Sequence, residues 1–212
     1  MTDTPAAARP RHNRRIAVIA LQGDFERHIH RLRDLGADPF AARTPDEVAA
    51  SDAIVIPGGE STTIGKLMVR YGLDSAIRDA HTAGKPIFGT CAGVILIARE
   101  IEESTQEHGG QPSLRLLDVT VARNAYGRQI DSFEDVIDAP DLVGPGEPQI
   151  PGVFIRPPAI TRCGAGVEVL GRHDGKPVLV RAGNVLGATF HPELTDDTRI
   201  HGYFLAMTPS EA

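Results

Sequence analysis

Short apolar runs alternate with longer segments of helical periodicity through the first half of the chain. The runs at 16–21, 53–56 and 86–88 contain no charged or hydrogen-bonding side chain. Continuous apolar runs of this length are typical of strands that are buried on both faces of a parallel sheet. A weaker strand is predicted at 38–42. The pattern therefore predicts a central parallel sheet.

Helices are predicted between these strands. Phe25, Ile29, Leu32 and Leu35 recur at spacings of three and four, with Asp24 placed to cap the start and Gly36 beyond the end. Further helices are predicted at 63–69, 73–83 and 94–101. Strands that alternate with helices in this way favour a sheet covered by helices on both faces.

After Gly110 the chain becomes rich in short predicted strands separated by Gly, Pro and Asp turns. These strands lie at 119–123, 130–137, 153–155, 167–170, 178–180 and 185–190. A last helix is predicted at 198–207, and 138–152 is predicted to be a surface loop. We expect a single three-layer α/β domain over 15–208, with a mixed, mostly parallel sheet and a β-rich second half. A disordered extension, 1–14, and a tail, 209–212, are expected to flank it.

Composition narrows the function classes. The net charge is −6, and four of the arginines lie within the first fifteen residues. The rest of the chain is therefore acidic, and it has no tryptophan, so nucleic acid is not an expected partner. Two cysteines make no disulfide framework, and no apolar stretch is long enough to span a membrane. We expect a cytoplasmic protein that does not contact membranes.

The strongest candidate for chemistry is Cys91, in the pattern Gly89-x-Cys91-x-Gly93 between a predicted strand and a predicted helix. This is the spacing of a nucleophile elbow, with cysteine in place of serine. Glycines on both sides let the strand and the helix approach each other closely. The thiol is then expected at a helix N-terminus, which favours the thiolate. The alternative is a buried structural cysteine.

A second candidate is the His191-Pro192-Glu193 segment, which follows the last predicted strand. In an extended chain, residues two apart point to the same side, so Glu193 can orient the imidazole of His191. A cysteine, a base and an orienting carboxylate are the parts of an activated thiol. The alternative is a surface turn.

A third motif, 57–61, places Gly58 and Gly59 directly after a buried strand. Backbone N–H groups of such a turn can point into a cleft and help bind an oxyanion. The spacing is not that of a phosphate-binding loop. Elsewhere, His28 and His30 are interpreted as polar residues of the first helix, with His28 solvated. No spacing of histidine and cysteine suggests a metal site, and Asp131 and Glu134 are interpreted as turn and strand-edge groups.

Together these motifs resemble the class I (triad) glutamine amidotransferases, from Ile16 to the last predicted helix. The elbow and the His-x-Glu segment are shared across that superfamily. Other segments resemble more specifically the glutaminase subunits of pyridoxal 5′-phosphate synthases. These segments are Glu60-Ser61-Thr62-Thr63, Arg123-Asn124 and Phe154-Ile155-Arg156, and Leu21-Gln22-Gly23 is a further matching segment. The resemblance implies a flavodoxin-like fold, and the first fifteen residues and Cys163 lie outside it.

The resemblance also implies roles for individual residues. Cys91 is similar to the nucleophile, His191 to the general base and acid, and Glu193 to its orienting carboxylate. The N–H groups of Gly59 and Ala92 are implied to form the oxyanion hole. Positions similar to those around bound glutamine are Gly59, Glu60, Ser61, Arg123, Ile155 and Arg156. Gln22 matches a position implied to sense the partner, and Cys163 is interpreted as a half-buried bystander.

The implied activity is hydrolysis of L-glutamine, with the ammonia passed to a synthase subunit of barrel fold. The resemblance implies no metal and no cofactor in this chain, since pyridoxal phosphate is the product of the complex. Two alternatives remain at this point. One is a γ-glutamyl hydrolase, or a glutaminase that supplies another synthase. The other is a non-catalytic binding member of the fold with a redox-sensitive Cys91.

Overall fold

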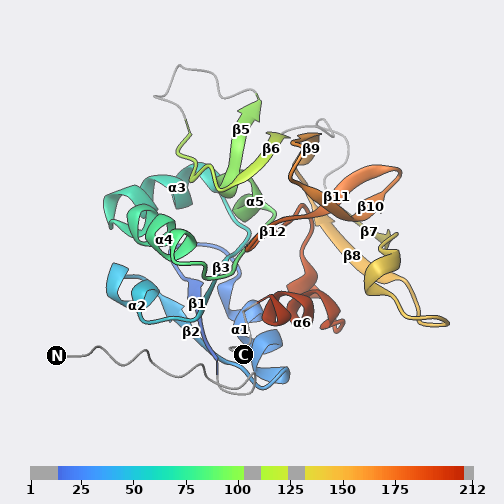
Figure 1. The fold of residues 1–212 in the computed structure, drawn as a ribbon, viewed down its shortest axis with the longest axis horizontal. Coiled ribbons are helices and arrows are strands. Elements are labelled where there is room, and N and C mark those ends of the chain that lie inside the picture. The colour runs from blue at the N-terminus through green and yellow to red at the C-terminus, as the bar shows by residue number, and fades with distance from the viewer. Residues whose placement is uncertain (1–13, 103–110, 124–131, 208–212) are drawn as a thin grey trace.

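A seven-stranded sheet forms the centre of the molecule, shown by a computed structural model that describes residues 14–102, 111–123 and 132–207 (Figure 1). Its strands are arranged in the order β10 (Glu168–His173), β11 (Lys176–Ala182), β12 (Val185–Ala188), β4 (Ile87–Thr90), β3 (Ala53–Ile56), β1 (Arg15–Ile19) and β2 (Asp38–Ala42). The five strands from β12 to β2 are parallel, and β11 and β10 are antiparallel to their neighbours. The predicted mixed, mostly parallel sheet is confirmed.

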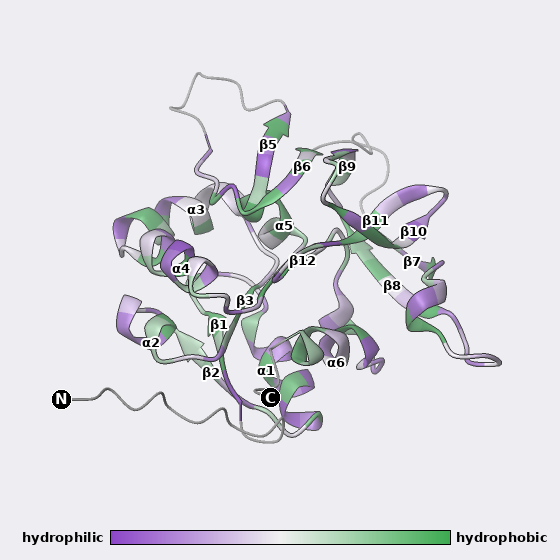
Figure 2. Ribbon diagram, viewed as in Figure 1, coloured by the Kyte–Doolittle hydropathy of each residue, from purple (hydrophilic) through white to green (hydrophobic). Residues whose placement is uncertain are grey.

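Helices cover both faces of this sheet. One face carries α1 (Phe25–Asp34) and α6 (Arg199–Ala206), and the other carries α2 (Pro45–Ala49), α3 (Ser61–Arg70), α4 (Leu73–Thr82) and α5 (Ala92–Ile97). Within β1, Ile16 and Val18 pack toward α1, while Ala17 and Ile19 pack toward α3. Successive strand residues point to opposite faces, so a strand with helices on both sides must be apolar throughout. Both hydropathy colours alternate along α1 and α4, as expected for helices with one buried face (Figure 2).

Two small sheets lie beside the central one. The first contains β5 (Ala98–Glu102), β6 (Leu117–Ala122) and β9 (Ala159–Cys163), and the second is the antiparallel pair β7 (Ser132–Ile137) and β8 (Ile150–Ile155). Two short 3-10 turns, η3 (Pro140–Leu142) and η4 (Pro192–Leu194), complete the described elements. The β-rich second half is therefore confirmed.

The structure differs from the local predictions at three points. The helix predicted at 94–101 ends at Ile97, and the chain continues as β5, because pairing with β6 there replaces helical hydrogen bonds. Strand β9 and helix α2 were not predicted, although Thr44 and Glu47 form a capping box at the start of α2. The predicted loop at 138–152 contains η3 and the start of β8.

The predicted extension and tail fall outside the described residues, except for Arg14. That residue is buried, and its guanidinium donates to the carbonyl of Leu205 at 2.7 Å. Within the described segments, no helix is long and apolar enough to cross a membrane.

Candidate active site

Cys91 lies at a sharp turn between β4 and α5. Its φ is 49° and ψ is −105°, an unusual conformation for a residue with a Cβ atom. Its N–H donates to the carbonyl of Ala188 on the neighbouring strand at 2.8 Å, which anchors the turn to the sheet. A Cβ atom at Gly93 would lie 2.1 Å from the carbonyl oxygen of Ile56, so only glycine lets α5 pack this closely on β3. The predicted elbow geometry is confirmed.

His191 and Glu193 follow β12, the neighbour of β4 in the sheet. The N–H of His191 donates to the carbonyl of Val153 at 2.8 Å, which ties this segment to β8. Its Nδ1 lies 2.7 Å from Oε1 of Glu193. The contact is made through the 3-10 turn η4, and not through the extended alternation predicted from sequence. The structure therefore brings the predicted base and its orienting carboxylate together by a different backbone path.

The electrostatics of this pair favour a charged imidazole. Burial acts to lower the pKa of His191, but the facing Cys91 and Glu193 outweigh burial and raise it above its ordinary value. Burial acts to raise the pKa of Glu193, but His28 and His191 outweigh burial and lower it. An ionised Glu193 keeps a proton on Nδ1 of His191, so that Nε2 is left to exchange a proton with the thiol.

A cleft of about 510 Å³ opens in front of Cys91. It is lined by Gln22, Gly59, Glu60, Ser61, Cys91, Ala92, Ile95, Arg123, Ile155, Arg156, Pro158 and His191. Every residue predicted for the site lies on this surface except Glu193, which is fully buried behind His191. Residues from the start of α3, the turn before α5 and α5 itself, the turn after β6 and the end of β8 meet here although they are far apart in sequence.

The turn after β3 is stabilised from two sides. Oε1 of Gln22 accepts from the N–H of Glu60 at 2.8 Å, and the Glu60 carboxylate caps α3 by accepting from the N–H groups of Thr62 and Thr63. Burial acts to raise the pKa of Glu60, but hydrogen bonds from the Thr63 hydroxyl and from these N–H groups lower it to about 2. Glu60 is therefore an ionised helix cap at the rim of the cleft.

Two cationic side chains lie at the cleft. Nη2 of Arg123 is 3.2 Å from Oγ1 of Thr62 and 3.7 Å from Oε1 of Glu60, so it is held above the start of α3. Arg156 has a positive φ of 40°, and the carbonyl of the preceding Ile155 lies 3.9 Å from the Cys91 sulfur. Guanidinium groups in such positions suit a carboxylate of a small substrate.

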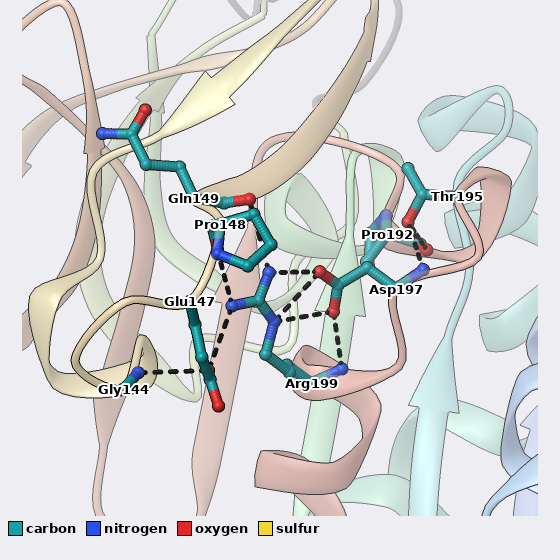
Figure 3. A network of polar contacts seen from close by, with 8 residues as sticks. All are labelled: Gly144, Glu147, Pro148, Gln149, Pro192, Thr195, Asp197 and Arg199. Atoms are coloured by element: carbon teal, nitrogen blue, oxygen red, sulfur yellow. Dashed lines mark hydrogen bonds and ion pairs between the residues drawn. The ribbon is translucent and has the colours of Figure 1, made fainter.

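The segment after Glu193 is held in place by a polar network around Arg199 (Figure 3). Arg199 forms an ion pair with Asp197 and donates to the carbonyl oxygens of Pro148 and Gln149, which precede β8. Its guanidinium also lies 3.5 Å from a carboxylate oxygen of Glu147. The network links the start of α6 to β8, the strand that carries Ile155. It therefore connects the segment that follows Glu193 to the strand on the other side of the cleft.

Other polar predictions had mixed outcomes. His28 was predicted to be solvated and that was wrong, because it is fully buried beside Glu193. A signal was available: His28 lies three residues after Phe25 and four before Leu32, on the apolar side of α1. Cys163 is half-buried and does not line the cleft, and burial raises the pKa of its thiol. Asp131 lies outside the described residues.

The sequence matches the model of the SNO glutamine amidotransferase family over residues 18–210. The chain belongs to that family. Within it, the chain is 48% identical over 193 residues to the pyridoxal 5′-phosphate synthase subunit PdxT of Chloroflexus aggregans, covering 91% of this chain and 99% of that protein. It is 47% identical over 208 residues to the subunit of the same name from Acidothermus cellulolyticus, covering 96% and 98%.

Solved structures agree with the family assignment. A crystal structure of a glutamine amidotransferase, 45% identical in sequence, superposes with a TM-score of 0.83 and covers 91% of this SNO-family chain and 98% of that chain. The structure of PurLQS from Thermotoga maritima is 19% identical, with a TM-score of 0.64, and supports the fold alone. The predicted family and fold class are confirmed.

Proposed function

We propose that this chain hydrolyses L-glutamine to L-glutamate and ammonia as the glutaminase subunit of a pyridoxal 5′-phosphate synthase, with Cys91, His191 and Glu193 as its catalytic triad. One observation carries the proposal: a cysteine in a strained elbow faces a carboxylate-bound imidazole at the floor of a cleft that is lined by two arginines. This arrangement suits nucleophilic attack on the amide of a small anionic substrate.

In the first half of the reaction, His191 carries the proton of the Cys91 thiol, and the thiolate attacks the side-chain amide carbon of glutamine. The N–H groups of Ala92 and Gly59 are the proposed donors to the oxyanion. Ala92 is the first residue of α5, and the first N–H groups of a helix have no partner within it. His191 then donates its proton to the leaving nitrogen, the carbon–nitrogen bond breaks, and ammonia and a glutamyl thioester result.

In the second half, His191 takes a proton from water, and the resulting hydroxide attacks the thioester carbon. The carbon–sulfur bond breaks, the new γ-carboxyl group gives its proton to solvent as glutamate leaves, and the Cys91 thiolate remains beside a protonated His191. Glu193 stays ionised throughout and stabilises the imidazolium. No residue changes oxidation state, and no cofactor takes part in the proposed reaction steps.

Arg123 and Arg156 are the proposed partners of the substrate α-carboxylate. Glu60 and Ser61, with the backbone of Gly59 and Ile155, are proposed to contact the rest of the amino acid. Glu60 is a special case, because its carboxylate already accepts hydrogen bonds from the start of α3. The α-ammonium group of the substrate would therefore pair with a carboxylate that the helix cap already holds in position.

The ammonia is proposed to pass to a synthase subunit of barrel fold in the cytoplasm. Neither nucleic acid nor a membrane is a proposed partner. The relatives named PdxT support this assignment, since they are named as subunits of that synthase and match over nearly their whole length. Gln22 is the proposed sensor of the partner, because its side chain holds the backbone next to Gly59.

The test is glutamate release from glutamine by wild type, Cys91→Ala and Cys163→Ala, with the barrel subunit of pyridoxal 5′-phosphate synthase present. We expect wild type and Cys163→Ala to be equally active, and Cys91→Ala to fall to the background rate. Release by Cys91→Ala at the wild-type rate would refute the assigned nucleophile. A wild type that releases no glutamate with the synthase would refute the proposed function.

A further inference from the structure

A cluster of buried polar side chains lies behind Glu193, on the side away from the cleft. His28 from α1, Thr90 from β4 and His201 from α6 are each fully buried. The ring of Phe88 lies roughly perpendicular to both imidazoles, at centroid distances of 6.3 and 6.0 Å. Burying two imidazoles in such surroundings is costly unless they form hydrogen bonds. The proposed reaction uses neither of them directly.

The distances connect the cluster to the triad. Nδ1 of His28 lies 3.0 Å from Nε2 of His201, and Nε2 of His28 lies 3.1 Å from Oγ1 of Thr90. The same Nε2 atom is 3.3 Å from Oε2 of Glu193. Among the described residues, that oxygen has no hydrogen bond of ordinary geometry. His28 is thus the side chain placed at the inner oxygen, while His191 binds the outer one.

The hydrogen bonds select one arrangement of protons. Burial lowers the pKa of both His28 and His201, so each carries a single ring proton at neutral pH. Nδ1 of His201 has no partner among the described residues, so its proton belongs on Nε2, which donates to His28. His28 then has its own proton on Nε2, which lies within hydrogen-bond distance of Thr90 and faces Oε2 of Glu193 at 3.3 Å. The reverse arrangement would leave a buried N–H without an acceptor and turn a lone pair toward the carboxylate.

We propose that His28 is a positioning residue for the glutaminase reaction: His201 holds it in the tautomer that donates to the inner oxygen of Glu193, and it thereby keeps His191 directed at Cys91. A carboxylate that is 0% exposed needs donors on both oxygens to remain ionised in one rotamer. With only His191 and its own backbone N–H to hold it, the Glu193 carboxylate would rotate or take up a proton.

The inference rests on the proposed glutaminase function and adds a fourth and a fifth residue to its machinery. The ionisable groups that face His28 are Glu193, His191 and Asp24, together with His201, and Arg31 also acts on His201. Removing the His28 donor leaves all of these in place. The expected effect therefore concerns the protonation of Glu193 and His191 more than the binding of substrate.

Two substitutions separate the contacts of His28. In His28→Asn, the shorter amide occupies the region of Nδ1 and keeps a partner for His201, but it does not reach Glu193. In His28→Gln, the longer amide places an N–H donor near the position of Nε2. Phe88→Leu is the packing control, because it loosens the rings around the cluster without removing a hydrogen bond.

Glutamate release is measured against pH and glutamine concentration, with the synthase subunit present. For His28→Asn we expect kcat to fall roughly 10- to 100-fold, the effect of losing a hydrogen bond to a charged group. KM should stay within about two-fold, since His28 does not line the cleft. The active pH range should narrow from both sides, because Glu193 then takes up a proton at higher pH and His191 loses one at lower pH. His28→Gln should retain most of the activity and the wild-type pH range.

A second measurement does not require glutamine. The rate of Cys91 alkylation by iodoacetamide is followed against pH in a Cys163→Ala background, with and without His28→Asn. The pH range over which the thiolate–imidazolium pair persists should narrow in the same way. This readout also works if wild type releases no glutamate, an outcome that would refute the proposed function but not the role of His28.

Several results would overturn the inference. One is a pH profile of His28→Asn that matches wild type in both assays, whatever its rate, because a structural role alone would leave the profile unmoved. Another is a folded His28→Gln with a narrowed profile, since the donor would then be present without its effect. A third is the same narrowing in Phe88→Leu, which would assign the effect to packing. Thermal melts identify any variant that fails to fold. If His28→Asn does not fold, the pH profile of His28→Gln provides the test.

Discussion

Gly93→Ala tests whether the elbow depends on close contact between α5 and β3. In most helices, replacing an interior glycine by alanine stabilises the fold by about 0.5–1 kcal/mol, because alanine loses less conformational freedom. At Gly93 the added methyl would lie 2.1 Å from the carbonyl oxygen of Ile56, a backbone atom of the central sheet. An ordinary contact between carbon and a carbonyl oxygen is about 3.3 Å or more. The helix must therefore move outward by about 1 Å.

The magnitudes follow from this displacement. Overpacking of a rigid core costs about 1–3 kcal/mol. A clash with a backbone oxygen in the middle of a sheet should cost an amount near the upper end of this range, because that atom cannot move aside. After subtraction of the helix-propensity gain, we expect a net loss of about 2 kcal/mol, or roughly 4–8 °C in Tm for a chain of this size. Catalysis should suffer more, because a displacement of about 1 Å at the nucleophile can cost about 100-fold in rate.

Gly202→Ala is the matched control. Gly202 also lies inside a helix, α6, and a Cβ atom there meets nothing within 4 Å. The Gly202→Ala substitution should leave stability unchanged or raise it by up to about 1 kcal/mol, and it should leave glutamate release unchanged. Both variants are compared by thermal and urea unfolding and by the glutaminase assay with the synthase. A Gly93→Ala variant as stable and as active as Gly202→Ala would show that the contact with Ile56 is not what requires glycine.

Two further predictions concern residues at the rim of the cleft. Arg123→Lys should raise the KM for glutamine about ten-fold with little change in kcat, because lysine cannot bind a carboxylate in a bidentate way. Arg78→Lys, on α4 and paired with Asp74, is the control and should leave KM unchanged. Glu60→Ala should cost about 1 kcal/mol of stability at neutral pH through loss of the helix cap. The folded-state pKa of Glu60 is about 2, below its ordinary 4.5, so the cap stabilises fully above pH 4.5 and its effect is lost as pH falls toward 2. Urea unfolding of wild type and Glu60→Ala should therefore converge at acid pH, and a difference that stays constant would contradict this account.

The features predicted correctly from sequence are those that a short segment imposes by itself. Residues 53–56 must be a buried strand, because four successive apolar side chains cannot all be covered on one face. The Gly89-x-Cys91-x-Gly93 spacing likewise specifies its own turn, since the two glycines and the strand–helix junction leave few other conformations. The strand, the elbow and the candidate nucleophile could therefore be predicted without any tertiary contact, and the family resemblance added the residues implied to surround bound glutamine.

The features that were missed depend on groups brought together from distant parts of the chain. Residues 98–101 continue an apolar helical pattern, yet they form β5 because β6 offers a sheet edge there. The spacing of His28 from Phe25 and Leu32 indicated a buried position, but only the fold places His201 and Thr90 at its ring nitrogens, with the Glu193 carboxylate beside them. Local sequence decides backbone conformation through sterics and apolar periodicity, whereas the protonation and direction of a buried side chain depend on which charges and donors the tertiary fold places around it.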